Sequence, residues 1–386
     1  MRVISVFFYV QHLLGIGHLA RASRIASAMR ARGMRVTLVT GGVPVKGFPA
    51  ADVDHLALPP LAVSDGAFSG LVDGRGQPAD QAYLDARRDQ LLRAFHDAAP
   101  DIVITEAFPF GRRQVRFELL PLIAAIAARQ PRPLLVTSLR DILQQSTKPG
   151  RDEETVDLVR RHFDRVLVHG DPSFVALEDT FPLADRIADK VSYTGLVCPP
   201  KPAPSPEHYD VVVSAGGGAV GADLVRAAIA AARLRPDLRR WCVITGPNLP
   251  QGDYEALEVD LPTTVTLCRF RTDFAQLLCS ARLSISQAGY NTVADILQAG
   301  CRALLVPFAV AGETEQTVRA TKLEARGRAV MLAEADLSGP AMVAAIDKAL
   351  AQDPASAATR IATDGADRSA AILADLAPGT APDPAA

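Results

Sequence analysis

Short apolar segments alternate with amphipathic segments along most of the chain. In the first half, strand-like runs rich in β-branched residues recur at 2–10, 35–40, 101–105, 133–138 and 165–169. Residues 19–32, between the first two runs, carry apolar side chains at helical spacing. Fully apolar strands separated by helices are typical of a parallel sheet that is covered on both faces.

A proline-rich segment interrupts this rhythm, and the rhythm then restarts. Residues 199–206 contain five prolines in eight positions, which predicts a stiff connector. Beyond it, strands are expected at 210–214, 241–245, 264–268, 283–286 and 303–307. Helices are expected at 222–235 and 356–376. The pattern therefore predicts two doubly wound α/β domains facing across a cleft. They are expected to span 1–198 and 207–377, with a disordered tail at 378–386.

Composition narrows the class of protein. The 386 residues are 48% hydrophobic and 22% charged, with a net charge of −2, which favours neither disorder nor nucleic-acid binding. Five cysteines without a CxxC pair argue against a disulfide framework and a zinc ribbon. No apolar stretch is long enough to span a membrane, so we expect a cytoplasmic or peripheral protein.

Each half has a glycine-rich loop after its first strand. The first contains Gly15, Gly17 and His18, and the second contains Gly216, Gly217 and Gly218. Neither is followed by the acidic residue that a dinucleotide site needs at the end of the next strand. The loops are therefore interpreted as phosphate- or substrate-binding turns at helix starts, the alternative being tight turns needed only for packing.

Among the histidines, His18 is the strongest candidate for a catalytic role. A helix N-terminus disfavours the protonated imidazole, so His18 is expected to be neutral and able to act as a general base. Glu106 follows a strand at its carboxyl end and could orient His18 or contact an acceptor. For both residues a purely structural role stays open. The apolar loop 107–111 and the arginines after it fit either a membrane-contacting surface or a buried loop.

The densest polar cluster lies in the second half. A strand at 283–286 leads into a turn and a helix, and a polar loop follows the next strand. The helix start is suited to a phosphate, and carboxylates and amides nearby could accept hydrogen bonds from sugar and ribose hydroxyls. The candidate donor-binding residues of this region are Gly289, Tyr290, Asn291, Thr292, Asp295, Glu315 and Gln316.

This region resembles the C-terminal signature of family 28 glycosyltransferases, which include the enzyme that adds GlcNAc to the lipid-linked peptidoglycan precursor. The pattern G-x-x-T-x-x-E reads Gly289-Tyr-Asn-Thr292-Val-Ala-Asp295 here, and Val306-Pro307 and Glu315-Gln316 follow. The resemblance implies the GT-B architecture and places Phe270 and Arg271 beside the nucleobase, through backbone groups. Asp295 replaces a ribose-binding glutamate, and Gly218 replaces a serine of the diphosphate loop.

The resemblance implies an inverting hexosyltransferase that uses a nucleotide sugar, with UDP as the expected nucleotide, and that needs no metal or cofactor. The acceptor is expected to be an alcohol or a glycolipid, such as a cell-envelope precursor. The acidic triplet Asp52-Val-Asp54 is interpreted as a solvated turn and not as a metal site. The alternatives are a nucleotide-sugar hydrolase, which the first loop also resembles, an epimerase, or a non-catalytic nucleotide-sugar sensor.

Overall fold

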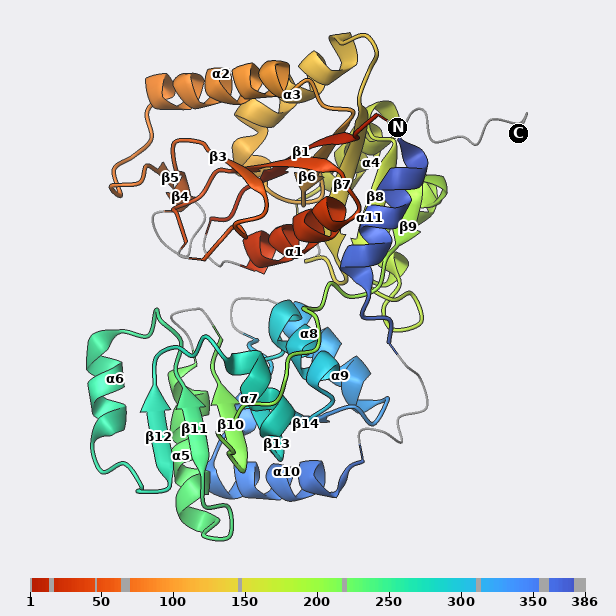
Figure 1. Ribbon diagram of the computed structural model, residues 1–386. Coiled ribbons are helices and arrows are strands. Elements are labelled where there is room, and N and C mark those ends of the chain that lie inside the picture. Colours follow the sequence, from red (N-terminus) through yellow and green to blue (C-terminus); the bar gives the residue numbers. More distant parts are fainter. Residues whose placement is uncertain are drawn as a thin grey trace. The chain divides into compact units, whose positions relative to one another are not determined.

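A computed structural model describes residues 2–13, 17–45, 47–63, 70–144, 148–216, 221–309, 314–353 and 361–377. The chain forms two compact units, drawn in Figure 1. Unit 1 comprises Met1–Val197 and Asp364–Ala386, and unit 2 comprises Cys198–Thr363. The predicted tail at 378–386 lies outside the described residues.

Unit 1 is built on a parallel sheet that has seven strands among the described residues, in the order β3-β2-β1-β6-β7-β8-β9. The strands are β1 (Ser5–Val10), β2 (Arg35–Thr40), β3 (Asp54–Ala57), β6 (Ile102–Glu106), β7 (Leu134–Arg140), β8 (Arg165–His169) and β9 (Val191–Tyr193). Its helices are α1 (Gly17–Ala31), α2 (Gln81–Ala98), α3 (Arg116–Ala128), α4 (Arg151–His162) and α11 (Gly365–Leu376). A small antiparallel pair, β4 (Ala62–Val63) and β5 (Leu71–Val72), lies apart from this sheet.

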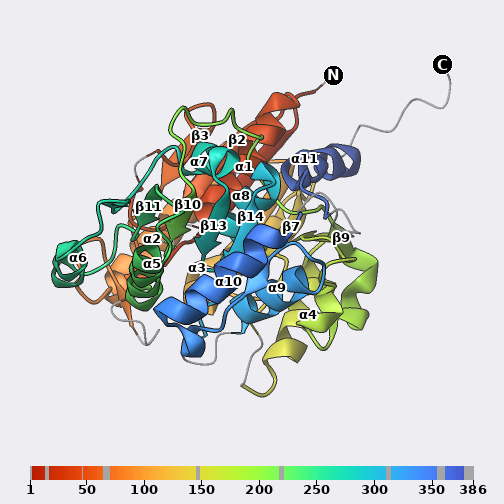
Figure 2. The ribbon, with the colours of Figure 1, turned by 90° about the horizontal axis from the view of Figure 1, so that it is seen from below.

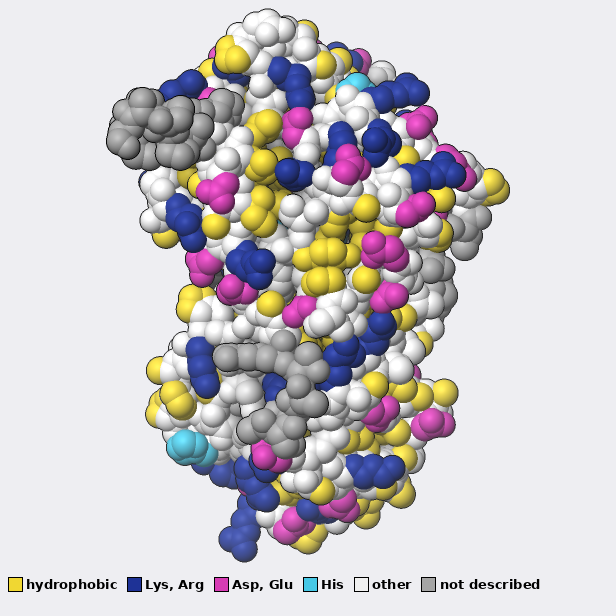
Figure 3. Space-filling view, turned by 90° about the vertical axis from the view of Figure 1, so that its right-hand side faces the viewer, with side chains coloured by type: hydrophobic (Ala, Val, Ile, Leu, Met, Phe, Trp, Pro, Cys, Tyr) yellow, Lys and Arg dark blue, Asp and Glu magenta, His cyan; other side chains and the backbone are white. Residues whose placement is uncertain are grey.

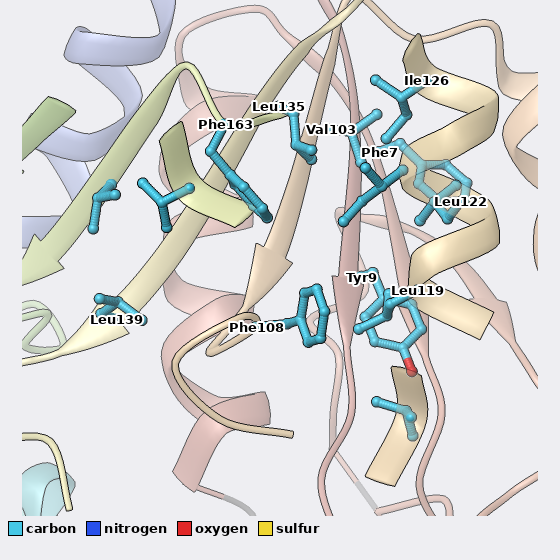
Figure 4. Packing of buried hydrophobic residues seen from close by; sticks show 14 of the residues in the cluster. Phe7, Tyr9, Val103, Phe108, Leu119, Leu122, Ile126, Leu135, Leu139 and Phe163 are labelled. Atoms are coloured by element: carbon cyan, nitrogen blue, oxygen red, sulfur yellow. The ribbon is translucent and has the colours of Figure 1, made fainter. Parts of the chain in front are cut away.

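Side chains of β1 alternate between two hydrophobic cores, one on each face of the sheet. Phe7 and Tyr9 belong to the core covered by α2, α3 and α4, part of which is drawn in Figure 4. Val6, Phe8 and Val10 belong to the core covered by α1 and α11. Because a strand turns successive side chains to opposite faces, a central strand of a doubly covered sheet is apolar at nearly every position. This explains why the whole of β1 is buried.

The last helix differs from the prediction in both extent and position. Helix α11 begins at Gly365, because residues 361–364 are not helical and Asp364 forms a β-bridge with Val197. It packs against α1, and Ala370 and Leu373 are buried in the core of unit 1. The chain therefore returns to the N-terminal unit, whereas the sequence pattern assigned this helix to the C-terminal domain.

Unit 2 has a six-stranded parallel sheet among the described residues, in the order β12-β11-β10-β13-β14-β15. Its strands are β10 (Val211–Ser214), β11 (Trp241–Ile244), β12 (Val265–Cys268), β13 (Leu283–Ser286), β14 (Arg302–Leu305) and β15 (Val330–Met331). Its helices are α5 (Ala222–Leu234), α6 (Gln251–Glu258), α7 (Phe274–Ser280), α8 (Tyr290–Ala299), α9 (Glu315–Glu324) and α10 (Gly339–Ala351). Helices α5 and α10 pack side by side on the core of the unit (Figure 2).

The strand order of each sheet contains one point of reversal. In unit 1 the chain winds outward in one direction from β1 and in the other from β6, and in unit 2 the same reversal lies between β10 and β13. Loops that leave two such neighbouring strands diverge and open a crevice at their carboxyl ends, where α/β proteins bind ligands. Both reversal points are thus the expected places for function.

One face of the molecule shows no strong electrostatic preference. On the face shown in Figure 3, basic and acidic side chains are interspersed over the described residues, in keeping with the net charge of −2. Within the described part of the chain, no helix combines the length and apolar character that crossing a membrane requires.

Candidate active site

His18 and Glu106 meet at the reversal point of unit 1. His18 is the second residue of α1, which follows β1, and Glu106 is the last residue of β6. Because β1 and β6 are adjacent and parallel, both residues lie at the same edge of the sheet. The Nδ1 atom of His18 lies 2.9 Å from Oε1 of Glu106.

Glu106 is fully buried and accepts hydrogen bonds on both carboxylate oxygens. Arg21 and His18 contact Oε1, and the Ser138 hydroxyl donates to Oε2 at 2.5 Å. Burial alone would raise the pKa of the carboxyl, but the Arg21 charge and the bonds from His18 and Ser138 outweigh it and lower the pKa of Glu106 to about 2. Glu106 is therefore ionised at neutral pH.

An ionised Glu106 determines which nitrogen of His18 carries the proton. The carboxylate accepts from Nδ1–H, so Nε2 is left with a lone pair, and among the described residues no group hydrogen-bonds to it. The side chain stays 19% exposed. Burial lowers the pKa of His18 to about 3, with the Glu106 bond opposing this and the charges of Arg112 and Arg21 adding to it. The imidazole is thus neutral and has the form that a general base requires.

A second histidine supports Glu106 from inside the unit. His169, at the end of β8, is fully buried, and its Nε2 lies 2.8 Å from the Ser138 hydroxyl. Its Nδ1 lies 2.9 Å from Oγ1 of Thr194. Because Ser138 donates to Glu106, it must accept from His169 Nε2–H, so the hydrogen bonds point in one direction toward the carboxylate. Burial lowers the pKa of His169 to about 3 and keeps this ring neutral.

Sequence reasoning missed Arg21, Ser138 and His169. Arg21 follows His18 by three residues, and this helical spacing places both side chains on one face of α1. Ser138 and His169 lie near the carboxyl ends of two strands that were predicted, β7 and β8, and Ser138 pairs directly with Glu106 in the β6–β7 register. Ser138 and His169 could have been found from the sequence as polar residues near the carboxyl end of a buried parallel strand.

The apolar loop after β6 is folded into unit 1. Phe108 is 1% exposed and belongs to the main hydrophobic core. Arg113 and Arg116, which the sequence suggested as a basic face, both pair with Glu154 at the start of α4. The buried-loop interpretation therefore applies to Phe108 and Pro109, whereas Phe110 is partly exposed.

In unit 2, the reversal point brings together the turns after β10 and β13. Ser214 and Ser286, the last residues of these strands, are register partners. Gly216 has a φ of +78°, and a Cβ there would lie 2.9 Å from Oε1 of Gln287, so the fold itself requires glycine. Gly217 and Gly218 of this turn, and Gly15 of the turn in unit 1, lie outside the described residues.

Gly289 precedes α8, and the space that a side chain at this position would occupy is open. Its φ is −64°, and no described atom would lie within 4 Å of an added Cβ, so the fold does not require glycine here. Val293 N donates to Gly289 O at 3.0 Å, so the amides of Tyr290, Asn291 and Thr292 precede the helical ladder. A helix start of this kind suits a phosphate. Asp295 lies in the second turn of α8, which begins at Tyr290.

Glu315 differs from the expectation that it would face a sugar. Its side chain is buried, and Oε1 accepts from Nη2 of Arg319 at 2.6 Å. Arg319 also donates to Ala288 O at 2.8 Å and lies 5.8 Å from the centre of the Tyr290 ring. Glu315 therefore supports the turn after β13 through Arg319, a residue that sequence reasoning missed despite the i,i+4 spacing. Gln316 accepts from Phe308 N at 3.2 Å and holds the loop after β14.

Phe270 and Arg271 follow β12. Phe270 is 62% exposed, which leaves its ring available to a flat ligand. The Arg271 guanidinium is bound by Asp273, at 2.7 Å, and by Glu207, at 2.9 Å. These bonds raise the pKa of Arg271. Because the guanidinium is already occupied, the backbone of Arg271 is better placed than its side chain to contact a ligand.

The acidic triplet near the start of unit 1 is engaged by α1. Ser27 donates to Asp52 Oδ1 at 3.2 Å, and Arg30 donates to the Asp52 carbonyl at 2.9 Å. Among the described residues, no three His, Cys, Asp or Glu side chains gather in a way that could hold a metal ion.

Comparison with known proteins identifies the second half of the chain. The model of the glycosyltransferase family 28 C-terminal domain matches residues 212–374. The chain is 28% identical over 388 residues to the UDP-N-acetylglucosamine--N-acetylmuramyl-(pentapeptide) pyrophosphoryl-undecaprenol N-acetylglucosamine transferase of Polaromonas sp. (strain JS666 / ATCC BAA-500). That alignment covers 94% of this chain and 89% of the relative.

Solved structures agree on the fold. CalG4, the calicheamicin glycosyltransferase, has a TM-score of 0.64 at 18% identity, covering 99% of this chain and 100% of that chain. MurG of Acinetobacter baumannii has a TM-score of 0.60 at 16% identity, covering 96% and 100%. Residues 212–374 match the family 28 C-terminal domain, a transferase relative aligns along nearly the whole chain, and the solved structures show the GT-B fold, so the chain is a glycosyltransferase that is similar to those of family 28.

Proposed function

We propose that the chain is an inverting, metal-independent glycosyltransferase in which His18 is the general base. Unit 2 would bind a nucleotide-sugar donor, with UDP as the nucleotide, and unit 1 would bind the acceptor. His18 Nε2 would remove the proton from the acceptor hydroxyl as its oxygen attacks the anomeric carbon. The bond to the nucleotide diphosphate breaks in the same step.

The observation that carries this proposal is the His18–Glu106 pair. A neutral imidazole with Nδ1–H bound to a buried carboxylate and a partly exposed Nε2 is the arrangement that proton removal requires. Glu106 would stabilise the imidazolium that forms, as the buried acid of a catalytic triad does.

Donor binding is proposed for the turns after β10 and β13. Gly216 and Gly289 lie at neighbouring strand ends, and the start of α8 supplies amides for the diphosphate. The relative's name supports UDP as the nucleotide and a lipid-linked pyrophosphoryl acceptor. Asp295 and Gln316 are the candidates for ribose and sugar hydroxyls, with Phe270 beside the base.

Metal independence and location are also part of the proposal. Helix N-termini would stabilise the departing diphosphate where other transferases use a divalent ion. The five cysteines of the protein are free, which suits a reducing compartment, so we place the reaction in the cytoplasm. When the acceptor is lipid-linked, the reaction would take place at the inner face of the membrane.

The test is donor turnover by the purified chain. Release of nucleoside diphosphate from a panel of UDP-, TDP- and GDP-sugars is measured with and without acceptor alcohols, and again after EDTA treatment. We expect acceptor-dependent release, a product of inverted anomeric configuration, and the same rate in EDTA. Fast release without any acceptor would favour the hydrolase, and no binding of any donor would refute the proposal.

Gly289→Ala tests the donor site without a cost to folding. Because nothing described would contact the added methyl group and φ is ordinary, the free energy of unfolding is expected to change by less than about 1 kcal/mol. A diphosphate bound close to the backbone would collide with it, so donor affinity is expected to fall about tenfold or more, measured by calorimetry. The matched control is Gly252→Ala, which also has open space but lies in α6. Equal donor affinity in both variants would contradict the assignment.

Ser138→Ala tests the positioning role of the hydrogen bonds behind Glu106. Removing the hydroxyl takes a donor from Glu106 Oε2 and leaves His169 Nε2–H buried without its acceptor, so the free energy of unfolding is expected to fall by about 1–3 kcal/mol. The catalytic constant should fall while the donor Kd stays unchanged. The control is Thr137→Val, because the Thr137 hydroxyl is buried and no group in the described residues bonds to it. A Ser138→Ala enzyme with full kcat would show that the hydrogen bonds from His169 through Ser138 to Glu106 have a structural role only.

A further inference from the structure

Unit 1 contains a cavity of about 630 Å³ that is lined in part by residues of the loop following β6, the strand that ends at Glu106. It lies between the loop that follows β6 and the start of α4. Four basic side chains line it, against one carboxylate, that of Asp152. The basic residues are Arg112, Arg113, Lys148 and Arg151.

Arg112 connects the cavity with the His18–Glu106 pair. Its Nε is buried and has no hydrogen-bond partner among the described residues. Its charge lowers the pKa of His18, and Glu106 in turn acts on Arg112, so the guanidinium lies within electrostatic reach of both. The backbone of Arg112 is left-handed, with a φ of +58°, which few residues other than glycine adopt. The loop thus places a guanidinium whose buried Nε lacks a hydrogen bond among the described residues at the wall of the cavity.

The other basic groups do not all have an acidic partner. Glu154 pairs with Arg113 and also with Arg116, so it cannot neutralise the rest of the wall. The described residues give the Arg151 side chain neither an ion pair nor a hydrogen bond. Burial lowers the pKa of Arg112 to about 10, with the charge of Glu106 opposing this shift and the charges of Arg140 and Arg21 adding to it. The cavity therefore keeps a positive excess at neutral pH.

Another part of the wall is apolar. Phe110 and Phe181 pack edge to face with ring centres 5.1 Å apart, and Leu143 lies beside them in the lining. A small inorganic ion would leave this surface exposed to water. A ligand that combines an anionic group with an apolar or aromatic body would contact both walls.

We propose that this cavity binds the acceptor, and that the acceptor is an anionic alcohol whose phosphate or carboxylate is held by Arg112 and Arg151. Arg112 would place the anion next to His18, so that a hydroxyl on the same molecule reaches Nε2. Arginine is suited to this because its planar guanidinium binds phosphate and carboxylate oxygens in pairs. This inference rests on the proposed transferase function and adds the cavity and the arginines that would hold the anionic group of the acceptor.

Binding of simple probes tests the cavity without requiring turnover. Phenyl phosphate, benzoate and benzyl alcohol are titrated into the purified chain by calorimetry, with excess UDP present to occupy anion sites in unit 2. The variants are Arg112→Gln, Arg112→Lys and Arg151→Gln, with circular dichroism as the check of folding. The matched control is Arg161→Gln, which removes the same charge from the far end of α4, where Arg161 is 72% exposed.

We expect phenyl phosphate or benzoate to bind the wild type and benzyl alcohol not to bind. Affinity should fall about tenfold or more in Arg112→Gln and Arg151→Gln, less in Arg112→Lys, and less than about twofold in Arg161→Gln. The tighter of the two anions identifies the acceptor group. Absence of anion binding, or equal binding by all variants, would overturn the proposal.

The result also separates this inference from the proposed function. If the cavity binds the anion but no nucleotide sugar is ever turned over, the transferase mechanism fails and the anion site stands. If transfer occurs equally well to charged and uncharged acceptors, the mechanism stands and the assignment of the cavity fails.

Discussion

Replacing His18 by alanine is expected to lower the rate of sugar transfer by a factor on the order of 10²–10⁴, the usual contribution of a general base. Nε2 of His18 is the group in position to accept the proton, and its Nδ1 is bound to Glu106 at 2.9 Å. The donor is assigned to unit 2, so its Kd should not change. Steady-state rates and donor calorimetry on the same preparation measure both quantities.

His208→Ala is the matched control, because His208 is exposed in unit 2 and has no place in the proposed chemistry. It should transfer sugar at the wild-type rate. If His18→Ala retained full activity, the non-catalytic sensor would become the better interpretation. If it lost donor binding as well as rate, the substitution would have disturbed more than the proton transfer.

The pH dependence of transfer follows from the low pKa of His18. The base works in its neutral form, and burial lowers the pKa of the imidazole to about 3. Its neutral fraction therefore stays close to one from pH 8 down to pH 5. The kcat/KM profile should show no acid limb in that range. An acid limb near pH 6.5 would show that His18 titrates as an ordinary histidine.

The fold could be predicted because the central strands of both sheets are buried. A parallel strand covered on both faces, such as β1 or β10, must be apolar at nearly every position, and such runs are visible in a single sequence. The place of α11 could not be predicted. Its apolar stripe requires some core to cover it, but the stripe does not say which of the two units supplies that core.

The site was predictable to the extent that chain order determines sheet order. His18 and Glu106 could be proposed as neighbours because each follows an early strand of the same sheet. The role of Glu315 could not be read in this way. A glutamate at a helix start fits a ligand hydroxyl as well as an internal arginine, and only the packing of α9 brings Arg319 between Glu315 and Ala288. The Glu315–Arg319 pair itself is local, at i,i+4 spacing within α9, but the bond from Arg319 to Ala288 depends on tertiary packing.

Glu106→Gln is expected to lower both transfer and stability. A glutamine can offer an N–H to His18 Nδ1, which would leave the proton on Nε2, and a loss on the order of 10²–10⁴ in rate is expected. The buried Arg21 would also lose its counter-charge. The pKa of Glu106 is lowered from 4.5 to about 2, so ionised Glu106 contributes about 3 kcal/mol to the free energy of unfolding above pH 4.5.

The sign of this contribution sets the pH window of the experiment. Because the folded pKa is the lower one, the stabilisation is complete above pH 4.5 and disappears as the pH falls toward 2. Urea unfolding should therefore show the advantage of wild type over Glu106→Gln shrinking by about 2 kcal/mol between pH 7 and pH 3. The exposed Glu258→Gln is the control and should follow the wild type throughout. If the difference in the free energy of unfolding between wild type and Glu106→Gln did not change with pH, Arg21 and His18 would not be holding Glu106 ionised. The proposal that His18 carries its proton on Nδ1 would then lack its physical reason.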